Sequence, residues 1–171
     1  ASYTFTYNDG DLLTAMIDDL GRGTFYGYDL RDQLSSVRDA SNGNLTIYGY
    51  TSAGQLSSIR SPLGSLTTFN YDPAFSMRIT DITDATGSPT RYLWDTDNNR
   101  IITTDPRNRS IAYTFDASGA LWYIDNVDGA TSLRDHAFEY DAAGRLTAWD
   151  RVTADDTSDY TLDYADPQTV T

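Results

Sequence analysis

A pair of large apolar residues followed by a turn recurs along this chain, and it limits the possible folds more than any other feature. In the clearest copy, Phe138 and Tyr140 lie two residues apart, Asp141 opens a turn, Gly144 closes it, and a second extended segment runs to Trp149. Residues two apart point to the same face of a β-strand. Asp accepts backbone N–H groups in turns and Gly adopts positive φ without a steric penalty. The stretch therefore predicts a β-hairpin.

The same unit is found eight times, at intervals of 21 to 25 residues. Its aromatic anchor is Tyr7, Tyr28, Tyr50, Tyr71, Trp94, Phe115, Tyr140 or Tyr164. The large apolar residue two positions earlier is Phe5, Tyr26, Tyr48, Phe69, Tyr92, Tyr113, Phe138 or Leu162. Periods of this length are typical of solenoids, propellers and similar stacks. We therefore predict an all-β fold of tandem hairpins, with seven full units and a half unit over residues 1–171. They would form one continuous curved or spiralling antiparallel sheet without a domain boundary.

Three turns depart from the pattern. The first unit turns at residues 8–10, one residue shorter than the others. Asp32 replaces Gly in the second unit, and Asp tolerates left-handed φ better than most residues, so this turn should survive. Phe75 stands where the fourth unit should have Gly, which predicts an altered turn there.

The second strand of each hairpin poses a question of phase. The apolar residues that recur in this strand are three positions apart: Leu34 and Val37, Leu56 and Ile59, Leu121 and Ile124, Leu146 and Trp149. In a flat strand this spacing puts them on opposite faces. Either both faces are partly buried, or a β-bulge resets the alternation and curves the sheet. The spacing alone leaves both possibilities open.

These motifs resemble the RHS/YD-repeat family, whose pattern is roughly Tyr-Asp-x-x-Gly-Arg-Leu. Residues 140–146 match it in full, residues 115–121 and 50–56 match in large part, and the resemblance extends along the chain. It implies a long spiral of hairpins that in the family commonly walls a hollow shell. Such shells occur in bacterial polymorphic toxins, insecticidal toxin complexes and animal cell-surface (teneurin-like) proteins, where the repeats are scaffold and not catalysts.

Two departures from the family are visible. Shells need many more than seven repeats. The three Asp-Pro pairs, at residues 72–73, 105–106 and 166–167, are not followed by the Asp-Pro-x-Gly signature that the family's toxins use for self-cleavage.

A weaker resemblance is to choline- or glucan-binding wall modules, which usually carry repeated Trp-Tyr pairs. It is disfavoured, because Trp122-Tyr123 is the one Trp-Tyr pair in the sequence.

Composition excludes several classes of partner. The chain has 25 acidic and 12 basic residues and a net charge of −13, which argues against nucleic acid and anionic membranes. No apolar run is long enough to span a bilayer, so we expect no membrane insertion. No Cys is present, and we expect no cofactor.

Candidate chemistry is sparse. Asp95, Asp97 and Asn99 alternate like the start of a calcium loop, but Arg100 takes the position of the usual Gly and Pro106 that of the bidentate carboxylate. A widened repeat turn is the favoured interpretation, and the metal site a weak candidate. The chain is therefore expected not to be an enzyme.

Other candidates rest on single residues. His136 is the one histidine, with no triad motif around it, and is expected at the surface. Asn44 and Asn108 begin glycosylation sequons, so glycosylation at either is possible. The aromatic stripe favours a cross-strand ladder, although exposed rings could stack on sugars.

The first and last strands are expected to pair beyond the chain, because neither carries a cap. The candidate assembly edges are Tyr3, Phe5, Tyr7, Tyr160, Leu162 and Tyr164. We expect self-association or continuation with further repeats. The main hypothesis is an extracellular or cell-surface scaffold, as a filament subunit or wall segment. The alternatives are part of a toxin shell that encloses cargo, and a carbohydrate-binding surface module.

Overall fold

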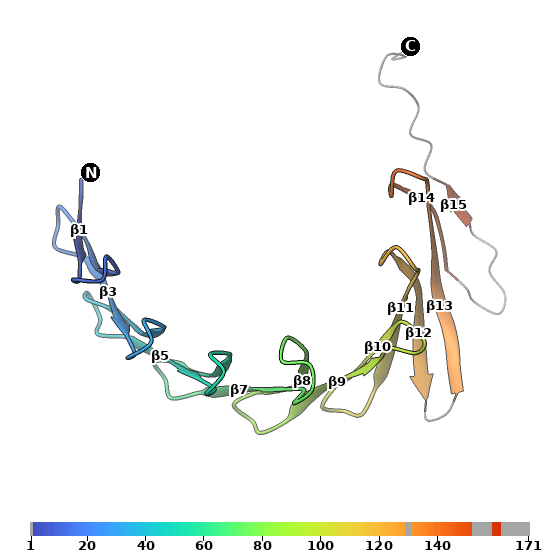
Figure 1. Ribbon diagram of the computed structural model, residues 1–171, viewed down its shortest axis with the longest axis horizontal. Helices are drawn as coiled ribbons and strands as arrows, with labels where there is room; N and C mark the ends of the chain where they lie inside the picture. The colour runs from blue at the N-terminus through green and yellow to red at the C-terminus, as the bar shows by residue number, and fades with distance from the viewer. Residues whose placement is uncertain (1, 129–130, 152–158, 162–171) are drawn as a thin grey trace, which may run out of the picture. The chain divides into compact units, whose positions relative to one another are not determined.

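The computed structural model is built of β-strands and turns (Figure 1). It describes residues 2–128, 131–151 and 159–161. By its internal contacts the chain divides into an N-terminal half, residues 1–89, and a C-terminal half, residues 90–171. Within the described residues, no helix is long and apolar enough to cross a membrane.

In the N-terminal half each strand pairs antiparallel with the next one along the chain. The strands are β1 (Tyr3–Tyr7), β2 (Leu13–Asp18), β3 (Gly23–Tyr28), β4 (Leu34–Asp39), β5 (Leu45–Tyr50), β6 (Leu56–Arg60), β7 (Leu66–Tyr71) and β8 (Ile79–Thr83).

The C-terminal half follows the same rule of sequential antiparallel pairing. Its strands are β9 (Pro89–Asp95), β10 (Arg100–Thr104), β11 (Ser110–Phe115), β12 (Leu121–Asp128), β13 (Thr131–Tyr140), β14 (Leu146–Arg151) and β15 (Asp159–Thr161). The predicted all-β architecture of tandem hairpins is thus confirmed. The undivided array over residues 1–171 and its curvature stay predictions.

A β-bulge follows the first residue of the second strand in most hairpins and answers the question of phase. In the hairpin of β3 and β4, Tyr28 pairs with Leu34 and Gly27 with Ser36, so Ser35 has no opposite residue. Val37 then pairs with Tyr26, which brings Leu34 and Val37 to the face of the two tyrosines. The same shift occurs in the hairpins β1–β2, β5–β6, β7–β8, β11–β12 and β13–β14.

One face of each half therefore carries the repeated apolar residues, and we call it the aromatic face. It bears the anchors, the large residues two positions before them, and the paired Leu, Val, Ile and Trp of the return strands. The opposite face is mixed, with residues such as Ser36 and Arg38.

The sheet is thinly covered. In the part of the chain that the structure describes, the buried apolar residues are Ala15 and Ala112, and no large side chain is fully buried. Most strand residues are half-buried. Soluble domains usually bury an apolar face against a second layer. Here that layer is absent from the described residues, so local hydrogen bonds and cross-strand pairs must stabilise each hairpin.

Candidate functional site

In the turn after the anchor Tyr140, hydrogen bonds converge on the carboxylate of Asp141. Asp141 Oδ1 accepts the backbone N–H groups of Ala143 and Arg145, both at 2.9 Å. Its Oδ2 accepts Arg145 Nε at 2.7 Å. Gly144 adopts a φ of 77°, which a residue with a Cβ rarely takes. The bonds from the Arg145 backbone and side chain hold the pKa of Asp141 below its ordinary value, so the carboxylate stays ionised.

A similar turn is found at the opposite ends of the strands, where one hairpin is joined to the next. Asp18 and Asp105 accept two backbone N–H groups and the Nε of the arginine four residues on. Ser61 takes the role with a single bond, from Ser65 N–H to its Oγ. Turns at both ends of the strands are thus held by side-chain oxygens that accept backbone N–H groups.

The three unusual turns have different outcomes. The first turn has full length: Asn8 opens it and Asp11, with a φ of 59°, takes the position expected for Gly10. The prediction of a turn one residue short was wrong, because alignment on the nearest Gly overlooked an Asp in the left-handed region. Asp32 has a φ of 61°, as expected of a surviving turn. The turn around Phe75 is altered, and Asp72 N–H reaches as far as the Arg78 carbonyl.

Tyrosine hydroxyls join neighbouring hairpins in the N-terminal half. Tyr28, Tyr50 and Tyr71 each donate to a main-chain carbonyl of the previous hairpin, at 2.8 Å in every case. The acceptors are Leu13, Leu34 and Leu56, the first residues of β2, β4 and β6. The strand ladders between these hairpins are short, so the hydroxyl provides a partner for a carbonyl beyond the last paired residue.

Side chains also link the turns that follow successive anchors. Gln33 Nε2 donates to the Gly54 carbonyl at 2.8 Å, and Gln55 Nε2 donates to the Ser76 carbonyl. In the C-terminal half, Asn99 Nδ2 donates to the carbonyls of Phe115 and Asp116, at 2.7 and 2.8 Å. These bonds couple each turn to the next.

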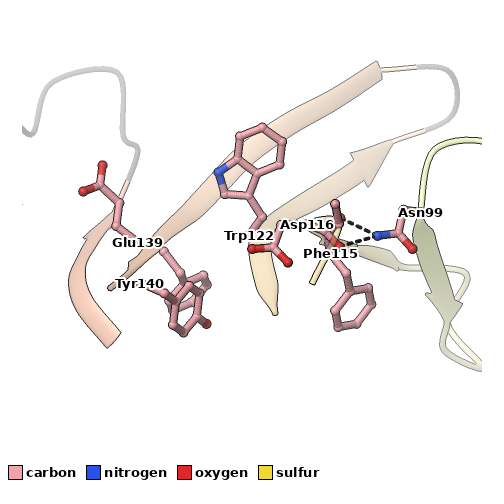
Figure 2. Close-up of a pocket in the computed structure, with 8 residues that line it drawn as sticks. Asn99, Phe115, Asp116, Trp122, Glu139 and Tyr140 are labelled. Atoms are coloured by element: carbon pink, nitrogen blue, oxygen red, sulfur yellow. Dashed lines mark hydrogen bonds between the residues drawn. The ribbon is translucent and has the colours of Figure 1, made fainter. Parts of the chain in front are cut away.

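A hollow of about 730 Å³ opens on the C-terminal half, between the hairpins β11–β12 and β13–β14. Its walls are Asn99, Phe115, Asp116, Ala117, Trp122, Phe138, Glu139 and Tyr140. Figure 2 shows Trp122 with Glu139 and Tyr140 on one side and Phe115, Asp116 and Asn99 on the other. The hollow thus joins aromatic rings to two carboxylates, a combination that sequence reasoning did not identify as a site.

The opposite face of the C-terminal half has a buried charge. Asp125 is 8% exposed. Its Oδ2 lies 3.7 Å from Arg100 Nη2, and its Oδ1 lies 3.7 Å from Arg134 Nε. The Arg134 guanidinium also covers the ring of Tyr123, with its Cζ 3.4 Å from the centroid. Because the carboxylate is compensated by two cations, this group is a structural network.

The candidate metal residues do not converge. Asp95 accepts the backbone and side-chain N–H groups of Asn98, and Asn99 turns away toward Phe115 and Asp116. Asp97 is exposed. Within the described residues no group of three or more His, Asp or Glu side chains could hold a metal ion. These turn contacts agree with the interpretation of a widened repeat turn.

The single-residue candidates lie in different environments. Asn44 and Asn108 are exposed, with Asn108 in a turn at a φ of 62°, and glycosylation of either stays a prediction. His136 is half-buried on the aromatic face, stacked between Phe138 and Trp149 at 6.3 and 6.1 Å between ring centroids. The expectation of a surface histidine was wrong, because His136 takes a place in the ladder.

The candidate assembly edges are partly described. Tyr3, Phe5 and Tyr7 are 56%, 50% and 57% exposed on β1. Tyr160 lies in β15, whose backbone pairs with β14 opposite Trp149. Leu162 and Tyr164 lie outside the described residues. That these positions mediate assembly stays a prediction.

Part of the chain is similar to a known family of repeats. Residues 28–66 match the family model of the RHS repeat, which confirms the resemblance noted in the sequence. No curated protein is similar enough to count as a relative.

Solved structures with the same fold include several crystal structures of TcdB2-TccC3 proteins. The one titled TcdB2-TccC3-Cdc42 superposes with a TM-score of 0.68 at 17% identity, over 93% of this chain and 10% of that chain. The one titled TcdB2-TccC3 without hypervariable C-terminal region gives 0.67 at 17%, over 93% and 9%. TcdB2-TccC3 itself gives 0.67 at 16%, over 93% and 10%. At this identity the likeness shows the fold alone, and the chain spans about a tenth of the length of these structures.

Proposed function

We propose that the chain is a segment of the wall of an RHS-type shell, since residues 28–66 match the RHS repeat model and similar hairpins lie on both sides of them. In this role it is a non-catalytic scaffold, and a larger set of repeats encloses a cargo polypeptide. The fold shared with structures about ten times its length supports a segment of a larger wall.

The exposed edge strand is the observation that carries this proposal. Tyr3, Phe5 and Tyr7 are each at least half exposed on β1, whereas Tyr26 and Tyr28 of the next hairpin are half-buried. The difference arises because β3 has paired strands on both sides, whereas among the described residues β1 pairs with β2 alone. A further hairpin paired to β1 would cover these rings, as unpaired β edges require.

The thin cover of the sheet supports a wall for a second reason. A sheet with both faces open leaves one face for the interior of a shell and the other for solvent or for partners. The turn carboxylates are occupied by backbone N–H groups, as at Asp141 and Asp116, which supports a structural role for them. An extracellular location is part of the proposal and rests on the family resemblance.

A filament is the competing function, because a second copy of the chain could pair with β1 instead. Electron cryomicroscopy of the natural gene product separates the two. Closed hollow particles with these hairpins in the wall support the shell, and extended fibres of regular repeat would support the filament. Particles in which β1 has no neighbouring strand would refute both.

An edge variant adds a matched test on the 171-residue chain. Phe5→Lys puts a charge on the exposed edge and should abolish any self-association seen by light scattering. Leu63→Lys is the control, because Leu63 is 95% exposed in a turn and lies away from β1. Equal association of both variants would show that β1 is not the assembly edge.

A further inference from the structure

The hollow in the C-terminal half stands at a fixed place in the repeat. A corresponding hollow of about 360 Å³ lies in the N-terminal half, between the hairpins β5–β6 and β7–β8. Each is bounded by a turn, by the bulge residue of one hairpin, and by the last residues of the first strand of the next. The C-terminal hollow is therefore an enlarged form of a general feature.

Substitutions at three repeat positions account for the difference. Gln55, which donates across the smaller hollow to Ser76, is replaced by Ala120, which has no donor to bridge the gap. The bulge residue Ser57 is replaced by Trp122. At the position before the anchor, Glu139 stands where the N-terminal half has Asn70. The enlarged hollow thereby loses its bridge and gains an aromatic wall and a carboxylate.

The electrostatics of this hollow favour a cation. Asp116 accepts the Ser118 hydroxyl and two backbone N–H groups, which lower its pKa and keep it ionised. Glu139 is exposed and supplies a second carboxylate. Trp122 is 46% exposed, although indole is the aromatic ring to which cations bind best.

Within the described residues, three aromatic rings are covered by a cation, and in each case the cation is arginine. Arginine guanidinium groups cover Phe25, Phe75 and Tyr123, with the Cζ atom 4.7, 4.2 and 3.4 Å from the ring centroid. A planar guanidinium can stack flat on an indole and at the same time donate to a carboxylate with its edge, whereas an ammonium group has no flat face to stack. Two arginines near the hollow's wall in sequence have carboxylate partners: Arg100, which follows Asn99, lies beside Asp125, and Arg145 is engaged with Asp141.

We propose that this hollow binds an arginine side chain of another polypeptide, with its guanidinium stacked on Trp122 and paired with Glu139. The occupant is a segment that carries an exposed arginine, and the negative net charge of this chain favours its approach. The inference goes beyond the shell proposal, because it concerns the chemistry of the hollow and holds in a filament as well.

The test uses the 171-residue chain labelled with ¹⁵N and two matched probes, N-acetyl-argininamide and N-acetyl-citrullinamide. Citrulline has the shape of arginine without its charge. We expect arginine to shift the indole N–H signal of Trp122 and the amide of Glu139 saturably, and citrulline to bind at least about tenfold more weakly. Sodium chloride should weaken arginine binding, since the carboxylate of Glu139 is solvent-exposed.

Variants locate the site. Trp122→Ser introduces the residue found at the corresponding bulge position 57, and Glu139→Gln removes charge without changing size. Each should reduce arginine binding about fivefold to tenfold, while Leu93→Ser, at an exposed apolar position on β9, should not. Amide spectra of β13 and β14 report whether the variants keep the fold.

Three results would overturn the inference. They are equal binding of arginine and citrulline, unchanged arginine binding in a folded Trp122→Ser variant, and larger shifts at Trp122 from maltohexaose than from arginine. The last would assign the hollow to a saccharide. None of these outcomes bears on whether the chain forms a shell.

Discussion

The hydroxyl of Tyr50 offers a direct test of how neighbouring hairpins are held together. Strands β4 and β5 pair over three residues only, Ser36 to Arg38 against Leu45 to Ile47. Beyond that short ladder, Tyr50 donates its hydroxyl to the Leu34 carbonyl at 2.8 Å. The substitution Tyr50→Phe removes this single oxygen and leaves the ring in place.

The expected cost follows from the environment of the bond. An intramolecular hydrogen bond contributes a net of about 0.5–1.5 kcal/mol, and more where the abandoned partner is cut off from water. Tyr50 is half-buried at the end of strand β5, so water can partly replace the hydroxyl. We therefore expect Tyr50→Phe to lower the free energy of unfolding by about 1 kcal/mol. The ring itself should fit, because Phe115 occupies the anchor position of another hairpin.

Urea unfolding followed by circular dichroism measures the effect. With an m-value of about 2 kcal/mol/M, a loss of about 1 kcal/mol moves the midpoint down by about 0.5 M. Tyr48→Phe is the control, because Tyr48 lies two residues away on the same face and its hydroxyl has no hydrogen-bond partner among the described residues. If both variants unfold at the same urea concentration, the hydroxyl bond does not stabilise the junction.

Three further outcomes are expected. Deleting Ser57 removes the bulge but leaves Leu56 and Ile59 two residues apart and still opposite Tyr50 and Tyr48, so it should cost less than about 1 kcal/mol in urea unfolding, and Ser57→Ala should be nearly neutral; a larger loss on deletion would show that the bulge itself stabilises the hairpin. Asp141→Ala removes the acceptor of two backbone N–H groups and should cost about 1 kcal/mol, while Asp141→Asn should cost less, because Asn8 builds the same turn; equal losses would contradict this. The pKa of Asp116 and of the similar turn carboxylates is lower in the folded chain than the usual 3.8, so their stabilisation is complete above the unfolded value and is lost as the pH falls through the folded one. The thermal midpoint should accordingly be steady above about pH 5 and fall below about pH 4, and a midpoint that rises in acid would refute the role of the turns.

The phase of the hairpins could be predicted from sequence because its signals are local. An anchor such as Tyr140, an apolar residue two positions before it and Asp141 after it fix a strand end and a turn within a few residues. The tolerance of Asp at position 32 and the altered turn at Phe75 follow from φ preferences alone. The spacing of Leu56 and Ile59 posed the bulge as one of two alternatives, and pairing with Tyr50 and Tyr48 selects it.

Features that depend on neighbouring strands could not be predicted in this way. Asp11 was overlooked because Gly10 beside it is the commoner turn residue. The place of Gly49 is set across the strand: a Cβ there would lie 2.5 Å from Ser58 Oγ, so the close approach of the bulged serines favours Gly in this hairpin. The hollow beside Trp122 depends on two adjacent hairpins, and no single repeat contains it.

The way these hairpins are stabilised explains why the fold suits a wall. A domain stabilised by a core is limited in size, because its core must be enclosed. Here the turn carboxylate, the tyrosine hydroxyl and the glutamine bridge each act within one hairpin or between two neighbours. Stability then grows as a sum over neighbouring units, and further hairpins can be added without a change of design. In such an array a residue that the repeat requires carries no information about partners. Trp122 and Ala120 depart from the repeat at one place, beside the exposed carboxylate of Glu139, and for that reason the search for a partner should begin there.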